Sequence, residues 1–244
     1  MTTTVRSPRA VVRGAVRTAA TTTAAGAGAG RLGTVLAIAA CASVLVGCAA
    51  SAPTDRSSAP EASVRPDLGT FAAVGDSITD ADSRDFASGD LGPASWARYV
   101  VDEGFVFAGG WAEWGATTER MAQSVAPVDA DVLVILAGTN DLAFGVPFDE
   151  SAANLDRVVD TVGIDDVLIV SIPPMDAYPD GADAMNERLD ELAADRGWRF
   201  VDASAGLRTL DGRFAEGMSS DGLHPSEEGA RVLGAAIADA LGAR

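Results

Sequence analysis

The chain contains one histidine, and a carboxylate lies close to it in sequence. His224 is the only histidine among 244 residues, and it follows Asp221 by three positions in the run Asp-Gly-Leu-His-Pro. A carboxylate at that spacing can hold one imidazole nitrogen and leave the other free to accept a proton. An unperturbed imidazole, with a pKa near about 6.5, is largely neutral at pH 7. Any histidine-dependent chemistry must use His224; the alternative is a surface histidine beside a turn-forming aspartate.

A serine suited to nucleophilic attack follows the first predicted strand. Gly75-Asp76-Ser77 comes directly after the apolar residues 71–74. At a strand-to-helix turn, the hydroxyl of Ser77 can stand free above the sheet edge, beside helix N-terminal amides. Such amides stabilise the negative charge that acyl transfer builds on a carbonyl oxygen. Gly-Asp-Ser is also common turn chemistry, so the tripeptide by itself leaves both interpretations open.

An amide side chain follows a second predicted strand. Asn140 lies in Gly-Thr-Asn-Asp at 138–141, immediately after the apolar run 132–137. Its side chain can donate a hydrogen bond to an oxyanion. The alternative is a helix cap or an Asx-turn, which needs only local hydrogen bonding.

Short apolar runs alternate along the chain with longer amphipathic segments. The pattern predicts strands at 71–74, 105–108, 132–137, 167–172 and 200–201. It predicts helices at 95–102, 117–125, 148–162 and 182–196, and a last helix that begins near Ser226. We therefore expect an α/β domain with a parallel sheet of about five strands covered by helices on both faces. Ligands of such sheets bind beyond the carboxyl ends of the strands, where Ser77 and Asn140 are expected.

Four motifs occur along the domain in a recognisable order: GDSI at 75–78, a glycine block around Gly115, GTND at 138–141 and DGLHP at 221–225. In these motifs the chain resembles the SGNH/GDSL hydrolases over essentially the whole domain. The resemblance implies a flavodoxin-like, three-layer α/β/α sandwich. The chain departs from the family at Ile78, where the family name has leucine, and in lacking the asparagine usually seen shortly before the glycine.

The resemblance also implies roles for particular residues. Ser77 is the expected nucleophile, and Asp221 and His224 complete the catalytic triad. Ser77 and Gly115 are the expected amide donors of the oxyanion hole, and Asn140 is its side-chain donor. We prefer Gly115 to Gly110 because the Ala-Thr-Thr after Gly115 resembles the family's usual continuation.

Three aromatic residues are candidates for the substrate pocket: Trp111 and Trp114, which flank the glycine block, and Tyr178, which follows the fourth strand. Ordinary loop packing is the alternative for them. The acidic residues Asp76, Asp80, Asp82 and Asp85 lack the glycine and terminal glutamate of a calcium loop, and no second histidine is present for zinc. We predict a site without metal or cofactor.

The N-terminal segment has the order of charge and hydropathy of a signal peptide. Five arginines without any acid precede the apolar run 32–47, which ends in Leu-Val-Gly-Cys. That tetrapeptide resembles a bacterial lipobox, with Cys48 as the lipidated residue. We predict a signal peptide at 1–48, a flexible tether at 49–67 and one hydrolase domain at 68–244. An ordinary cleaved signal or an uncleaved anchor is the alternative.

The formal charge of the chain is -17 at pH 7. This charge makes nucleic acid an unsuitable partner and disfavours polyanionic substrates. We expect an exported monomer at the outer face of a bacterial membrane, which it contacts only through the lipid anchor. The expected activity is hydrolysis of a small-molecule, glycan or lipid ester through an acyl-enzyme. The alternatives are an acyltransferase on envelope glycans and a non-catalytic, glycan-binding lipoprotein, which would have lost part of the site.

Overall fold

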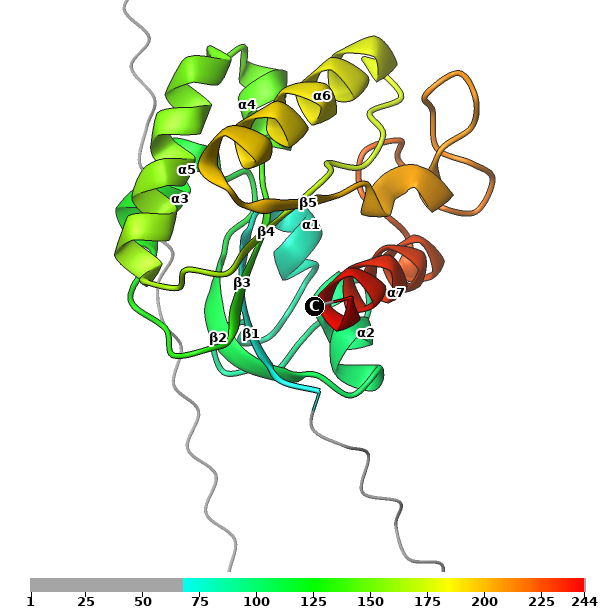
Figure 1. Ribbon diagram of the computed structural model, residues 1–244. Coiled ribbons are helices and arrows are strands. Elements are labelled where there is room, and N and C mark those ends of the chain that lie inside the picture. The colour runs from blue at the N-terminus through cyan, green and yellow to red at the C-terminus, as the bar shows by residue number, and fades with distance from the viewer. Residues whose placement is uncertain (1–67, 244) are drawn as a thin grey trace, which may run out of the picture. The chain divides into compact units, whose positions relative to one another are not determined.

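Five parallel strands form one sheet at the centre of the domain, in the order β2-β1-β3-β4-β5 (Figure 1). They are β1 (Thr70–Gly75), β2 (Val106–Ala112), β3 (Val132–Leu136), β4 (Val167–Val170) and β5 (Arg199–Val201). This is the predicted flavodoxin-like order, and the fold class is confirmed. The computed structural model describes residues 68–243. The predicted signal peptide, lipobox and tether therefore lie outside the described residues.

Helices cover the sheet on both sides (Figure 1). α2 (Trp96–Asp102) packs against α7 (Glu227–Gly242) on one face, and α3 (Thr118–Ser124) packs against α5 (Phe148–Val162) on the other. α6 (Pro179–Arg196) joins β4 to β5, and right-handed crossovers place it on the face of α5. Within residues 68–243, no helix is both long and apolar enough to cross a bilayer.

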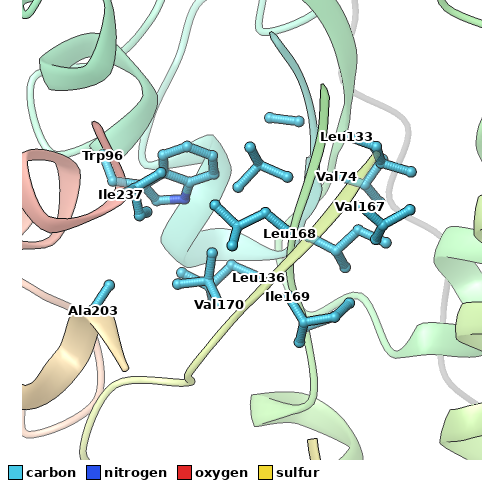
Figure 2. Packing of buried hydrophobic residues seen from close by; sticks show 14 of the residues in the cluster. Val74, Trp96, Leu133, Leu136, Val167, Leu168, Ile169, Val170, Ala203 and Ile237 are labelled. Carbon is cyan, nitrogen blue, oxygen red and sulfur yellow. The ribbon is translucent and has the colours of Figure 1, made fainter. Parts of the chain in front are cut away.

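The core lies between the central strands and these helices. All residues of β3 and β4 are buried, as is β1 after its first residue. Trp96 of α2 and Ile237 of α7 lie together on one side of these strands (Figure 2). The continuous apolar runs in the sequence arise because β1, β3 and β4 are covered on both faces.

The second strand is longer than the sequence pattern predicts. The expected strand at 105–108 continues to Ala112 and takes up the first part of the glycine block. Gly110 permits this, because a Cβ there would lie only 1.9 Å from the carbonyl oxygen of Ala73 on β1. The register also shifts between Phe71 and Ala72, so that Gly109 pairs with Ala72. Gly109 and Gly110 lie beyond the end of the predicted strand, at residue 108. In the structure they allow a bulged strand to approach its neighbour closely.

Two short helices begin at the carboxyl ends of the central strands, and neither was predicted as a separate element. α1 (Ser77–Asp80) follows β1, and α4 (Thr139–Phe144) follows β3. β1 and β3 are neighbours at the point where the strand order reverses, since the chain goes from β1 to the edge strand β2 and then back to β3. Doubly wound sheets form their ligand crevices at such a switch point. The fold therefore brings Ser77 and Asn140 to the same place.

Candidate active site

Ser77 is the first residue of α1 and is 6% exposed. The Asp76 side chain caps this helix by accepting a hydrogen bond from the Ile78 N–H over 2.9 Å. The helix is also held at Thr79. The hydroxyl of Ser95 donates to the Thr79 carbonyl over 2.6 Å, and the indole of Trp96 donates to the Thr79 hydroxyl over 3.0 Å. These buried bonds from the start of α2 fix the short helix that carries Ser77.

The histidine loop reaches the serine from the other end of the chain. Ser77 Oγ lies 2.9 Å from His224 Nε2, and Asp221 Oδ2 lies 2.8 Å from His224 Nδ1. With Nδ1–H donating to the carboxylate, Nε2 is the nitrogen that accepts the serine proton. The structure thus brings together Ser77, Asp221 and His224 in the order that general-base activation of a serine requires.

The carboxylate of Asp221 is held by its own loop as well as by the imidazole. Its Oδ1 accepts hydrogen bonds from the backbone N–H groups of Leu223 and His224, over 2.9 and 2.8 Å. Burial acts to raise the pKa of Asp221, but these bonds and the one from the imidazole outweigh it and hold the pKa below its usual range. Asp221 is therefore an anion that orients and stabilises a protonated His224.

Asn140 lies beside the serine on the first turn of α4. Its Nδ2 donates to Asp76 Oδ2 over 3.1 Å and to the Ala116 carbonyl over 3.0 Å. Both amide hydrogens therefore have acceptors in the free protein. A charged oxygen is the stronger acceptor, so an oxyanion beside Ser77 would compete for an N–H that now bonds the neutral Ala116 carbonyl.

The structure distinguishes the two glycines that the sequence left as alternatives. Gly110 lies within β2, packed against the backbone of Ala73. Gly115 lies in the exposed turn after β2, with φ +72°, where a Cβ would meet nothing within 4 Å. Its neighbours on either side, Trp114 and Ala116, both contact the site, through His224 and Asn140 respectively. This placement favours Gly115 as the amide donor.

Trp114 alone of the three candidate pocket aromatics lines a cavity beside the serine. The cavity measures about 140 Å³ and its lining residues include Ser77, Trp114 and His224. Trp111 belongs to β2, where it lies under the guanidinium of Arg120. Tyr178 precedes α6, and its ring packs over Gly181. Neither Trp111 nor Tyr178 is among the residues that line this cavity.

A buried polar network surrounds Asp141, the residue next to Asn140, and the sequence pattern did not predict it. Asp141 is fully buried and accepts hydrogen bonds from the Thr118 N–H, the Thr118 hydroxyl and the Ser151 hydroxyl, over 2.9, 2.5 and 2.8 Å. Asn154 donates to the Thr118 hydroxyl over 3.0 Å. These bonds tie α4 to α3 and α5. The partners are 10 to 36 positions apart in sequence, so no local sequence pattern predicts these hydrogen bonds.

Among residues 68–243, no group of three or more histidine, cysteine or acidic side chains is arranged to hold a metal ion. The acidic residues near Ser77 have other partners. Asp76 caps α1, Asp80 accepts a hydrogen bond from the Trp114 indole over 2.8 Å, and Asp85 accepts one from the Ser88 N–H over 3.2 Å. The candidate lipidation residue, Cys48, lies outside the described residues.

The Asp76 carboxyl makes stability depend on pH. Its complete burial raises its pKa from 3.8 to about 7. Between these values the unfolded chain releases the proton while the folded protein retains it, so the free energy of unfolding falls as pH rises. The full effect is on the order of 4 kcal/mol. In urea titrations at pH 4 to 8, the wild type should lose stability relative to Asp76→Asn as pH rises. If the free energies of unfolding of the two proteins changed in parallel with pH, the pKa of Asp76 would not be raised in the folded protein.

Comparisons with known proteins identify the family and the fold of the chain. Residues 73–232 match the model of the GDSL-like Lipase/Acylhydrolase family. A search of curated protein sequences finds no significant match.

Solved structures with a similar fold include a GDSL-like lipase from Bacteroides thetaiotaomicron, with 18% identity and a TM-score of 0.54 over 71% of this chain and 88% of that one. A lipolytic protein of the G-D-S-L family from Veillonella parvula has 20% identity and a TM-score of 0.54, over 70% and 96% of the two chains. A variant of an acetyl xylan esterase from Geobacillus stearothermophilus has 21% identity and a TM-score of 0.56, over 72% and 95%. At these identities the likeness concerns the fold.

Proposed function

The chain belongs to the GDSL-like lipase/acylhydrolase family and is a hydrolase, and we propose that it cleaves carboxylic esters through an acyl-enzyme on Ser77. The observation that carries this proposal is the geometry of the serine, with its Oγ 2.9 Å from His224 Nε2 and Asp221 2.8 Å from the other ring nitrogen. A nucleophile, a base and an orienting carboxylate in contact are what acyl transfer to serine requires.

In the first half of the reaction, Ser77 Oγ attacks the carbonyl carbon while His224 Nε2 takes the hydroxyl proton. The carbonyl oxygen becomes an oxyanion, which the Ser77 N–H, the Gly115 N–H and the Asn140 amide stabilise. The bond between the carbonyl carbon and the alcohol oxygen then breaks, and His224 gives its proton to the leaving alcohol. The product of this half is an ester between Ser77 and the acyl group.

In the second half, water takes the place of the alcohol beside His224. The imidazole removes a proton from the water, whose oxygen attacks the acyl carbon. The bond to Ser77 Oγ breaks, and His224 returns the proton to that oxygen. Asp221 remains ionised throughout, since its hydrogen bonds keep its pKa low.

An organophosphonate that phosphonylates activated serines, with loss of its leaving group, tests this proposal. It should inactivate the protein with one adduct per chain, located on Ser77 by peptide mass mapping. A competing ester should slow the reaction. Inactivation without a Ser77 adduct, or labelling that survives in His224→Ala at the same rate, would contradict the proposed nucleophile and base.

Replacing Asn140 by alanine should lower kcat for p-nitrophenyl acetate about 10²–10³-fold, the loss expected for one oxyanion donor. The KM should change little, because the donor acts where charge develops in the transition state. Steady-state kinetics measure both values, and thermal unfolding checks that the Asp76 and Ala116 contacts are not needed for folding. A raised KM with unchanged kcat would instead give Asn140 a role in ground-state binding.

We also propose that residues 1–48 direct export and that Cys48 carries a lipid, which the order of arginines, apolar run and Leu-Val-Gly-Cys supports. Cys48→Ala should move the protein from the membrane fraction to the soluble fraction, as measured by immunoblotting of fractionated bacteria. Cys41→Ala is the matched control and should stay with the membrane. Retention of Cys48→Ala in the membrane at wild-type levels would contradict lipid anchoring.

A further inference from the structure

The cavity beside the nucleophile has an apolar wall and a polar mouth. Its lining consists of Ser77, Ile78, Ala81, Asp82, Ala94, Trp114, His224 and Pro225. Ile78 and Ala81 are buried, whereas Asp82 is exposed. A hydrocarbon group entering past Ser77 would therefore meet the side chains of Ile78, Ala81, Ala94 and Pro225 and one side of the Trp114 ring.

The position of the cavity determines which part of an ester can enter it. Ser77 and His224 line it, but Asn140 does not. The carbonyl oxygen must point to the oxyanion donors, so the acyl tail and the alcohol occupy the remaining directions. The alcohol has to leave and water has to reach His224 while the acyl group stays attached to Ser77. Because the leaving alcohol also lies beside His224, the position of the cavity alone suits either group. The apolar walls favour the acyl tail, which stays attached to Ser77 while alcohol is exchanged for water.

The size of the cavity limits that group. The cavity measures about 140 Å³. It is smaller than the roughly 300–1,000 Å³ of pockets that enclose a whole drug-sized ligand. An acetyl or butyryl tail suits a cavity of this size, whereas an octanoyl tail would extend beyond it. The alcohol lies outside the cavity, so its size is not restricted by these walls.

Two contacts hold Trp114 as one wall. Its indole Nε1 donates to Asp80 Oδ2 over 2.8 Å, and Asp80 is the last residue of the helix that carries Ser77. Its ring centroid lies 5.1 Å from that of His224, with an angle of 33° between the rings. The indole remains 51% exposed. Trp114 is thus fixed between α1 and the imidazole.

Ala81 and Asp82, which also line the cavity, form a tight backbone turn after α1. Both have left-handed φ values, 43° and 58°, which costs about 1–2 kcal/mol for each non-glycine residue. Gly92 packs onto this turn, and a Cβ there would lie 2.0 Å from the Ala81 carbonyl oxygen. This close packing leaves the turn little room to shift toward Gly92.

From these observations we infer that the cavity is an acyl pocket that restricts the enzyme to short acyl groups, with Trp114 as the residue that sets the length limit. The inference rests on the proposed serine esterase activity and narrows its substrates to short-acyl esters of alcohols that stay outside the cavity. Asp82 at the mouth also disfavours acyl groups that end in a carboxylate.

Two ester series applied to the full chain test this inference. The first varies the acyl group in p-nitrophenyl acetate, butyrate and octanoate, and the second varies the alcohol in phenyl and 1-naphthyl acetate. In the wild type, kcat/KM for acetate should exceed that for octanoate at least about tenfold. Trp114→Ala should raise the octanoate-to-acetate ratio about tenfold or more, because it removes the wall. The ratio of kcat/KM for phenyl acetate to that for 1-naphthyl acetate should be the same in Trp114→Ala as in the wild type.

Two further variants distinguish the loss of the cavity wall from a general loss of structure or activity. Trp114→Phe keeps an aromatic wall and should retain preference for acetate even though it loses the bond to Asp80. Phe144→Ala removes an aromatic side chain that is 70% exposed on α4 and does not line the cavity, so it should change neither ratio. Circular dichroism of each variant establishes that it is folded.

The inference is overturned if the wild type has the same kcat/KM for p-nitrophenyl octanoate as for the acetate. It is also overturned if Trp114→Ala leaves the octanoate-to-acetate ratio of kcat/KM unchanged. A change confined to the aryl acetate ratio would overturn it too, by assigning the cavity to the alcohol. Failure of the esterase proposal is distinct, because the wild type would then hydrolyse no ester faster than Ser77→Ala does.

Discussion

Replacing Ser77 by alanine should lower kcat/KM for p-nitrophenyl acetate by about 10⁶-fold, the loss seen when a triad serine is removed. The variant lacks the atom that forms the bond to the acyl carbon. Within residues 68–243, Ser77 provides the only hydroxyl hydrogen-bonded to the imidazole of His224, over 2.9 Å. Water attack assisted by the oxyanion donors would give the residual rate. The measurement is release of p-nitrophenol under steady-state conditions, corrected for spontaneous hydrolysis.

A matched serine controls this experiment. Ser88 is exposed and its hydroxyl donates to the backbone of Asp85 over 3.1 Å, so Ser88→Ala should retain wild-type kinetics. Both variants should unfold at temperatures close to that of the wild type, since Ser77 Oγ contributes one hydrogen bond at the site. A Ser77→Ala protein that keeps more than a few per cent of the activity would refute a covalent mechanism at this residue.

Replacing His224 by alanine should cost about as much as replacing Ser77, and the double variant should cost no more than either single change. The two residues act as one unit, because a serine without its base is a weak nucleophile and a base without the serine has nothing to deprotonate. The chain contains no second histidine that could take over. Added imidazole should restore part of the activity of His224→Ala and none of that of Ser77→Ala.

The pH profile of the histidine variant gives an independent readout. Without an internal base, the residual rate should rise with hydroxide concentration over the whole accessible range, whereas the wild type should reach a plateau once its base is neutral. Losses that multiply in the double variant would mean that Ser77 and His224 act separately. That result would contradict the proton transfer on which the mechanism depends.

The sequence could predict where the residues proposed for catalysis lie, because their places depend on strand ends and on one short loop. Ser77 and Asn140 directly follow buried strands, and the carboxyl ends of parallel strands meet at one edge. Asp221 and His224 lie in one short loop, so their contact is local. Their proximity to Ser77, 147 positions away, followed only from the resemblance to a known family, since nothing local in the sequence specifies it.

Features that depend on contacts between distant segments could not be predicted. The extension of β2 through Gly109 and Gly110 depends on how closely β1 approaches, which is set by the bulge in their pairing. That Trp114 lines the cavity, whereas Trp111 and Tyr178 do not, depends on how segments distant in sequence pack together. The short helices α1 and α4 have too few residues for an apolar period to appear.

The buried acids illustrate the same limit. In sequence, Asp76 and Asp141 are ordinary turn residues beside Ser77 and Asn140. In the fold, both are fully buried. Asp76 caps α1, which carries Ser77, and accepts a hydrogen bond from the Asn140 amide. Asp141 accepts hydrogen bonds from Thr118 and Ser151. Their effect on the site comes from burial, which composition and spacing do not report.

The most direct test of the central claim is the intact mass of the protein during turnover. After rapid mixing with p-nitrophenyl acetate and acid quenching within the first turnover, the wild type should gain the mass of one acetyl group, and peptide mapping should place it on Ser77. Release of p-nitrophenol should show a burst of about one equivalent per chain. Hydrolysis without a burst and without any acetylated Ser77 would contradict the acyl-enzyme account.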